Sequence, residues 1–496
     1  MVPVRFRNDD ALSPQARHLS AMKSKVVKLF AANTFSYLLV GVSFIAYSRL
    51  LSPGEFGTYG AAFALASMLA LVLDGGIKTT IIKMPREVTD TEEVTILFLM
   101  LCGASLITVL FSLLQNPILH WKPQLAQDYR FAVLFVGTSL ICYPLVTLPT
   151  ARLERRLDYG HIAWIESTSM LLERGAPAIF VAVFHIGVYS FFWALLLSRA
   201  FRVSALSMFH RPAILRISFR TVREPLHLLR EGSWIQLGSL ANVVRDNLPL
   251  LLVGPFFGKV WIGNYTWAMQ VCQISSQAFA QISARVSLPI FARQDSFEAR
   301  WPSYLQQIRL LATLTAPVLC AVWLILPPVN AHLFHGKWTS ALLLVPLLFM
   351  RMIPGLATTP LGPLVLVHCG GYIYAKLSCM WTTVEFVAAL LCLYFIGPTG
   401  LAWSYAFVVW VGLALMLSPL AQSRRGLAGP LIAEILRRPS LAFSAIAVFS
   451  LALLIRDCGP KYVDNIWLFG ILASIVVLAA YCLEPEMRKL VKNAKA

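Results

Sequence analysis

Charged residues are scarce in this chain of 496 residues. Asp, Glu, Lys and Arg make up 13% of it, whereas soluble proteins carry about 25%. Hydrophobic residues make up 58%, and the mean hydropathy is +0.69. A chain with so few charges cannot cover its surface with side chains that water solvates, so the composition indicates an integral membrane protein. The same figures exclude a disordered chain, a coiled coil and a disulfide-stapled secreted scaffold.

The common motifs of soluble enzymes are missing as well. The chain contains no GxxxxGK[ST], no GxGxxG after an expected strand, no HExxH and no GxSxG. Its nine cysteines form no CxxC pair and no zinc-type cluster with histidine. The two longest loops expected outside the membrane, 115–129 and 327–339, share a single carboxylate, Asp128, which is too little for a membrane glycosyltransferase. The sequence therefore predicts a protein that is not an enzyme, without metal or cofactor.

Acidic residues are far fewer than basic ones. The chain has 24 Asp and Glu against 42 Lys and Arg, a net charge of +18. In a soluble protein this excess would suggest nucleic acid as a partner, but in a membrane protein it is typical of cytoplasmic loops. We therefore expect membrane lipids as neighbours and no nucleic acid.

Apolar runs long enough to cross a bilayer are abundant. A spanning helix needs about 20 mostly apolar residues. Fourteen runs are expected to span: 26–50, 58–77, 94–114, 130–150, 161–184, 187–209, 232–254, 264–289, 304–326, 340–361, 372–396, 398–420, 441–455 and 466–483. Residues 1–25 are basic and lack the apolar stretch of a signal peptide, so 26–50 is expected to remain as the first span.

The distribution of Lys and Arg predicts the orientation. With the N-terminus in the cytoplasm, the outside loops hold only Lys122, Lys259, Lys337, Arg456 and Lys461, and most of the other cations fall on inside segments. Cytoplasmic loops carry the excess of Lys and Arg in membrane proteins. We therefore expect a membrane protein with both termini in the cytoplasm.

Two basic connections divide the expected spans into six, six and two. The predicted organisation is a basic tail (1–25), a first six-helix lobe (26–209), a basic linker (210–231), a second six-helix lobe (232–420), a basic loop (421–440), helices 13 and 14 (441–483) and a cytoplasmic tail (484–496). Gly57-Thr58-Tyr59 follows the first span of one lobe, and Gly263-Asn264-Tyr265 follows the first span of the other, 206 residues later. This match favours parallel repeats, at whose interface transporters bind substrates.

Six ionisable residues are expected near the middle of spans. They are Glu173, Arg174, Arg245, Asp246, Arg351 and Glu385. A charge at the centre of a bilayer costs about 3 kcal/mol unless it is paired or faces water. One interpretation is that these residues form structural ion pairs between helices. The other is a hydrated chamber between the lobes, which six charges at one depth favour.

Two of these pairs are adjacent in sequence, Glu173 with Arg174 and Arg245 with Asp246. Neighbouring residues on a helix point about 100° apart, so we expect each to pair across helices or with a ligand. The guanidinium fork suits a phosphate. Our hypothesis is that Arg174, Arg245 and Arg351 bind substrate in a central cavity, and that Glu173, Asp246 and Glu385 compensate their charge or take up H⁺ or Na⁺.

The segment after the first span carries a family resemblance. Arg49 to Tyr59, RLLSPGEFGTY, resembles a signature of the polysaccharide transporter family, the Wzx-type flippases of the MOP exporter superfamily. Further resemblances follow in order along the chain, at Asp74-Gly75-Gly76, at 153–159, at 246–254 and at 289–293. Together they cover residues 26–300.

The resemblance implies an all-α membrane fold of the MOP/MATE type, with about 14 transmembrane helices in two six-helix lobes around a central cavity and two further C-terminal helices. It also implies movement of an undecaprenyl-pyrophosphate-linked oligosaccharide across the inner membrane for exopolysaccharide, O-antigen or capsule synthesis, with polymerase or chain-length machinery as partners. The alternatives are a lipid II flippase, a MATE-type cation-coupled drug exporter and a non-transporting scaffold of a polymerase complex. The first span, 26–50, contains no Asp or Glu, which counts against the drug exporter.

Overall fold

The computed structural model describes residues 39–78, 81, 89–114, 126–155, 159–209 and 223–423, and within these ranges it contains helices and no strand. A helix at Leu39–Leu50 precedes the following labelled helices: α2 (Pro53–Asp74), α4 (Asp90–Leu113), α6 (Ala126–Arg155), α7 (Tyr159–Phe184), α8 (Tyr189–Phe209), α9 (Arg223–Phe257), α10 (Lys259–Ala292), α11 (Phe297–His332), α12 (Thr339–Leu342), α13 (Val345–Cys369), α14 (Gly371–Ile396), α15 (Gly400–Leu417) and α16 (Leu420–Ser423).

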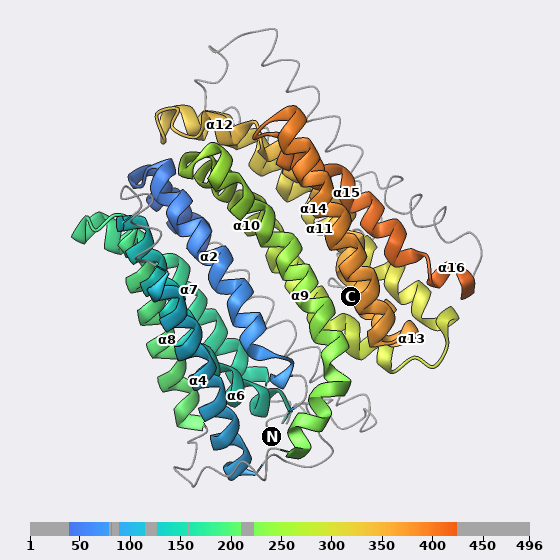
Figure 1. Ribbon diagram of the computed structural model, residues 1–496. Coiled ribbons are helices and arrows are strands. Elements are labelled where there is room, and N and C mark those ends of the chain that lie inside the picture. Colours follow the sequence, from blue (N-terminus) through green and yellow to red (C-terminus); the bar gives the residue numbers. More distant parts are fainter. Residues whose placement is uncertain are drawn as a thin grey trace, which may run out of the picture.

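The helices form two lobes side by side (Figure 1). In the first lobe α6 packs against α2, α4 and α8, and α7 packs against α8. In the second lobe α14 packs against α9 and α15, and α13 packs against α10, α11 and α15. The lobes meet where α2 of the first contacts α9 and α10 of the second. The all-helical, two-lobed fold predicted from the sequence is confirmed.

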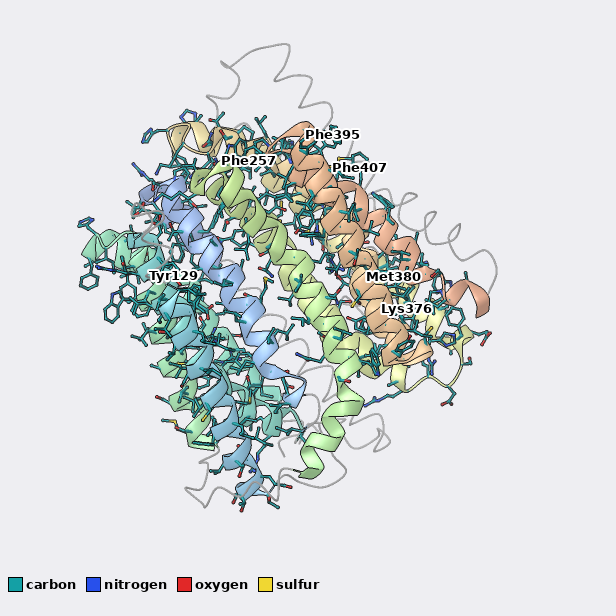
Figure 2. All side chains as sticks on the ribbon, in the orientation of Figure 1. Tyr129, Phe257, Lys376, Met380, Phe395 and Phe407 are labelled. Carbon is teal, nitrogen blue, oxygen red and sulfur yellow. The ribbon has the colours of Figure 1, made fainter. Side chains whose placement is uncertain are left out.

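The outside of the bundle is apolar. Within the described ranges, seven helices are long and apolar enough to cross a membrane, and large apolar side chains on α14 and α15 are exposed. Figure 2 labels three of them, Met380, Phe395 and Phe407, of which Phe395 is 76% exposed. A soluble protein does not expose contiguous apolar surface of this kind. The chain is a multi-pass membrane protein.

Each of the first twelve expected spans overlaps a helix within the described residues, which for the first span are 39–50. Two differences concern their limits and shape. Helix α9 begins at Arg223, so the last part of the segment predicted as a linker (210–231) is helical, because a helix continues beyond the apolar stretch that marks the span. In place of a straight span at 340–361, Thr339–Met352 and Pro354–Cys369 are bent by 42° relative to each other, where Pro354 cannot donate the hydrogen bond of a straight helix. The tails, the loop 421–440 beyond Ser423 and helices 13 and 14 lie outside the described residues.

The start of α2 follows directly from the sequence. Ser52 and Glu55 form a capping box, in which the Ser52 hydroxyl accepts from the Glu55 amide and the Glu55 carboxylate accepts from the Ser52 amide at 2.8 Å. Pro53 occupies the first helical position, where its missing N–H costs nothing. The helix ends at Gly75, whose φ of 53° is the left-handed conformation that favours glycine.

Alternate connections lie at opposite ends of the bundle, and we name the ends by a lysine at each. At the Lys78 end, Lys78 pairs with Glu154 at 2.8 Å and Arg152 pairs with Glu93 at 2.5 Å. At the Lys337 end lie the starts of α2 and α10 and the short helix α12 (Figure 1). Because α2 and α10 both run from the Lys337 end toward the Lys78 end, the two lobes have parallel orientation.

Candidate functional site

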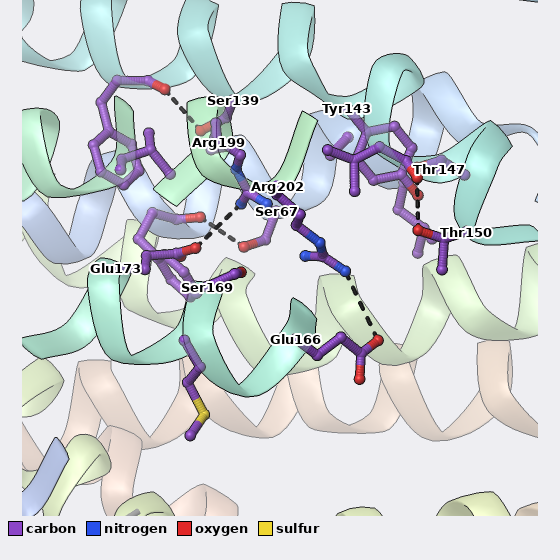
Figure 3. A pocket seen from close by; sticks show the side chains of 18 of the residues that line it. Ser67, Ser139, Tyr143, Thr147, Thr150, Glu166, Ser169, Glu173, Arg199 and Arg202 are labelled. Carbon is purple, nitrogen blue, oxygen red and sulfur yellow. Dashed lines mark hydrogen bonds and ion pairs between the residues drawn. The ribbon is translucent and has the colours of Figure 1, made fainter. Parts of the chain in front are cut away.

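The first lobe contains a cavity of about 690 Å³. Helices α2, α6, α7 and α8 line it, and Val243 of α9 adds one residue from the second lobe. Its wall carries many hydroxyl groups, several of which Figure 3 labels: Ser67, Ser139, Tyr143, Thr147, Thr150 and Ser169. Ser67, Ser139 and Thr150 donate to carbonyls one turn back in their own helices, so their oxygens remain as acceptors. Such a wall favours water or a polar ligand over lipid.

The charges of the cavity come mainly from α7 and α8. Glu173 of α7 faces Arg199 of α8 at 3.5 Å, and Glu166 faces Arg202 at 3.8 Å (Figure 3). Arg199 and Arg202 are three residues apart, so they share one face of α8. Both ion pairs are longer than a charge-assisted hydrogen bond of about 2.8 Å. A ligand with stronger acceptors can therefore compete for these arginines.

Arg174 differs from the other arginines of the cavity. It lines the wall next to Glu173, yet it makes no hydrogen bond or ion pair with any residue that the structure describes. Lys78, the fourth cation of the wall, is held by Glu154. The wall has four cations and two carboxylates, Glu166 and Glu173. With Glu154 counted as the partner of Lys78, one positive charge remains in excess, and it favours an anionic ligand.

The second lobe holds a separate charged cluster around Asp246 of α9. Arg351 of α13 donates to the Asp246 carboxylate at 2.5 Å, and its guanidinium lies 4.2 Å from the ring centre of Tyr405. The guanidinium carbon of Arg245 lies 3.8 Å from the ring centre of Trp381. The aromatic faces stabilise the two cations where water is scarce.

Glu385 of α14 belongs to the same cluster. Its side chain is 2% exposed, and the charges that act on it are those of Arg351, Arg245 and Asp246. Its Oε1 atom has no hydrogen-bond partner among the described residues. A buried carboxylate oxygen without a donor is unfavourable, so this position is suited to a change of charge state.

The six residues singled out from the sequence therefore fall into two groups. Glu173 and Arg174 line the cavity of the first lobe, whereas Arg245, Asp246, Arg351 and Glu385 gather in the second lobe and are not part of that cavity's wall. Cross-helix pairing is confirmed for Glu173, with Arg199, and for Asp246, with Arg351. The expectation that Arg245 would not reach Asp246 is wrong, because the long side chain bends back to 3.6 Å.

Sequence reasoning missed Arg199 and Arg202 as cavity residues. Both arginines lie within the span expected at 187–209, inside α8, but we did not count them among the charges near the middle of spans. A signal was present, since Glu166 and Glu173 are two helical turns apart on one face and Arg199 and Arg202 lie on one face of the next helix. Among the described residues, no group of three or more His, Cys, Asp or Glu is arranged to hold a metal ion.

Known proteins resemble this chain over most of its length. The succinoglycan biosynthesis transport protein ExoT of Rhizobium meliloti is 24% identical over 322 residues, 63% of this chain and 62% of that protein, so less than two thirds of that relative is covered. The lipopolysaccharide biosynthesis protein WzxC of Escherichia coli is 22% identical over 366 residues, 71% of this chain and 72% of that protein.

A solved structure shares the fold. The lipid II flippase MurJ in its inward closed conformation matches with a TM-score of 0.67 over 94% of this chain and 100% of that chain, at 11% sequence identity. Residues 46–343 match the family described as polysaccharide biosynthesis protein. Since this match takes in more than half of the sequence, the chain belongs to the polysaccharide biosynthesis protein family.

Proposed function

We propose that this protein is a flippase that moves undecaprenyl-pyrophosphate-linked oligosaccharide repeat units from the cytoplasmic to the periplasmic leaflet of the bacterial inner membrane. The observation that carries the proposal is the hydroxyl-lined cavity with excess positive charge in the first lobe. A lipid diphosphate must cross about 30 Å of hydrocarbon, and a polar wall with available cations lowers the cost of that passage. The relatives named for polysaccharide transport and biosynthesis support the same activity.

We propose Arg174 as the first ligand of the diphosphate, because it lines the cavity and has no partner among the described residues. Arg245 and Arg351 would bind the diphosphate as the lobes rearrange, when the phosphate oxygens displace the Asp246 carboxylate. Glu173, Asp246 and Glu385 would neutralise these arginines in the empty protein. H⁺ or Na⁺ would bind at these carboxylates and couple an ion gradient to transport.

The proposal includes the setting of the protein. Both termini would lie in the cytoplasm, which makes the Lys78 end cytoplasmic and the Lys337 end periplasmic. The polymerase and chain-length machinery would receive the repeat units at the periplasmic face. The bias of Lys and Arg toward the expected inside segments supports this orientation.

The direct test is transport by the purified protein in liposomes with fluorescent polyprenyl-diphosphate oligosaccharides. We expect the label to become accessible to an impermeant quencher at a rate that depends on the protein. Movement of lipid II alone would assign the activity of the lipid II flippase, and movement of organic cations alone would assign a drug exporter. No movement of any of these would favour the scaffold.

A cellular test separates transport from polymerisation. Deleting the gene should abolish surface polysaccharide while lipid-linked repeat units accumulate on the cytoplasmic leaflet, because a flippase makes no bonds. If complete repeat units accumulated unpolymerised at the periplasmic face instead, the flippase proposal would be wrong.

A further inference from the structure

The helix Leu39–Leu50 ends with carbonyl groups that its own chain does not satisfy. The chain turns at Ser52-Pro53, and proline has no N–H to donate. The missing donors come from the opposite lobe. Lys337 donates to the carbonyl oxygens of Arg49 and Leu51 at 2.6 and 3.0 Å, and the Trp338 indole donates to the carbonyl of Ser48 at 3.1 Å.

This junction is tightly packed. Trp338 is fully buried and stacks on Trp267 of α10 with ring centres 5.0 Å apart and planes 7° apart. Trp267 in turn donates to the Ser48 hydroxyl at 3.0 Å. Burial lowers the pKa of the Lys337 ammonium, and the nearby Glu55 carboxylate opposes this effect. Three residues of the second lobe thus hold the end of one helix of the first.

A second bridge lies at the same end of the bundle. Asp128 of α6 accepts from the Thr58 hydroxyl of α2 and from the Lys259 ammonium of α10, each at 2.9 Å. The carboxylate therefore joins two helices of the first lobe to the first residue of α10 in the second. Its ion pair lies near the surface, where Lys259 keeps 54% of its side chain exposed, so it breaks at low cost.

Two glycines allow α2 and α10 to approach this closely. A Cβ added to Gly57 would lie 2.8 Å from the carbonyl carbon of Lys259 and closer still to its oxygen, and one added to Gly263 would lie 2.7 Å from the carbonyl carbon of Pro53. Each overlap is with the residue four positions before the other glycine, so the contact is reciprocal. Gly57 and Gly263 are the glycines of the repeated Gly-x-Tyr pattern, and equivalent positions of the two lobes therefore face each other.

The lobes are joined differently in the other half of the bundle. There, Gln236 of α9 donates to the Leu71 carbonyl of α2 at 3.0 Å, and the charged cavity opens in the wall beside it. The Lys337 end thus carries several inter-lobe bonds and direct backbone contact. This asymmetry is what a transporter needs if one end is closed while the site is loaded from the other.

We propose that the Lys337 end is the periplasmic gate, a clasp formed by Lys337, Trp338, Asp128–Lys259 and the Gly57–Gly263 contact, and that it parts to release the substrate. The assignment of this end to the periplasmic face, and of release as the step that it controls, rests on the proposed function. The donors of the clasp exchange protein acceptors for water when the gate opens, so opening costs little per bond. The glycine contact fixes how near the lobes come when the gate shuts.

The test measures the exposure of a cysteine placed inside the clasp. Ser48 is fully buried between the lobes, so Ser48→Cys in lipid nanodiscs should react slowly with a water-soluble maleimide. The parent protein without the added cysteine gives the baseline of the native cysteines. Adding Gly57→Ala or Gly263→Ala should raise the labelling rate at least about fivefold, because the added methyl group keeps the lobes apart. Equal rates with and without these changes would overturn the gate.

Gly54→Ala is the matched control on the same helix. The three atoms nearest to a Cβ at Gly54 would be side-chain carbons of Lys259, the first at 3.6 Å, which is ordinary van der Waals contact, so labelling should stay at the level of Ser48→Cys alone. Should the glycine variants fail to accumulate, Lys337→Met removes the clasp donor without adding bulk and should raise labelling as well. An unchanged rate in Lys337→Met would contradict the clasp. This readout requires no transport, so it separates failure of the gate from failure of the proposed function.

A cross-link tests whether the gate must open during transport. A Cβ added at Gly54 would lie 3.9 Å from the Lys259 Cγ atom, whose place the sulfur takes in Lys259→Cys. The two sulfurs of Gly54→Cys with Lys259→Cys are therefore within reach of a short bis-thiosulfonate linker. Linked protein in proteoliposomes should lose transport, and a reducing agent should restore it to the rate of the unlinked double variant. Normal transport by the linked protein would overturn the proposal. Each single-cysteine variant controls for the linker itself.

Discussion

Arg351 donates its short hydrogen bond, 2.5 Å, to the carboxylate of Asp246 on a different helix, and that carboxylate keeps 45% of its side chain exposed. The pair is therefore an ion pair that a competing anion can reach from the Asp246 side. A fully buried pair would cost several kcal/mol to break. The exposed acceptor makes Asp246 replaceable by a phosphate at a lower cost.

We expect Arg351→Ala and Arg245→Ala to leave the protein abundant in the membrane but unable to export polysaccharide. Arg245→Lys should restore export only in part, because an ammonium offers a point charge in place of a planar fork. Membrane abundance by immunoblot and surface polysaccharide are the two measurements. If the arginines are structural instead, the alanine variants will lose abundance and Asp246→Asn will restore it. Full export by an abundant Arg245→Ala, Arg351→Ala double variant would refute the ligand role.

Arg174→Ala should abolish transport without a loss of stability. The side chain has no hydrogen bond or ion pair with a described residue, so its removal leaves no partner unsatisfied. Substitutions of this kind change the free energy of unfolding by about 0.5 kcal/mol or less. Arg199→Ala is the contrasting control, since it leaves the Glu173 carboxylate without its cation and should lower the thermal midpoint of the purified protein. Binding of a soluble pyrophosphate to both variants, measured by calorimetry, checks the assignment. Wild-type affinity in Arg174→Ala would contradict it.

Local signals in the sequence were sufficient for the ends of several helices. Ser52-Pro53 followed by Glu55 contains the whole chemistry of a helix start, because the cap, the proline and the N3 carboxylate are all within four residues. The equivalence of Gly57 and Gly263 was also legible as a repeated pattern. Their contact across the lobes was not, since a single sequence does not state which repeated positions meet.

The candidate site was harder to predict because depth in a span does not fix the direction of a side chain. Arg174 and Arg351 were expected at one depth and in one cavity, yet each is oriented by the rotation of its own helix, which depends on packing against neighbours. Arg199 shows the converse error. It lies inside the expected span 187–209 but was not counted as a candidate site residue, whereas its long side chain brings the charge to the cavity wall.

The orientation of the protein can be tested by reporter fusions. Fusions at Glu55 and Lys337 should report the periplasm, and a fusion after Ala496 should report the cytoplasm. The physical reason is that Lys and Arg concentrate on the segments expected in the cytoplasm and are few in the loops expected outside, which hold Glu55 and Lys337. A fusion at Arg155, at the Lys78 end, serves as an internal cytoplasmic control. A periplasmic signal after Ala496 would contradict an even number of spans.

A glycine on α15 allows a test of the second-lobe cluster from a distance. A Cβ added to Gly412 would lie 2.5 Å or less from several ring atoms of Trp381, and Trp381 supports the guanidinium of Arg245 at 3.8 Å. Gly412→Ala should therefore displace the indole, move Arg245 and reduce transport at least about tenfold, with a stability loss of about 1–3 kcal/mol from overpacking. Transport in proteoliposomes and thermal unfolding measure the two effects.

Gly355→Ala provides the control for this prediction. Gly355 also lies within a membrane helix, α13, but a Cβ at that position would have no neighbour within 4 Å, so both transport and stability should remain near wild type. Combining Gly412→Ala with Trp381→Leu then separates packing from cation support. The smaller side chain relieves the overlap and should recover stability, whereas transport should stay low because Arg245 has lost the aromatic face that holds it. Recovery of both together would show that Trp381 serves packing alone and that Arg245 acts independently of it.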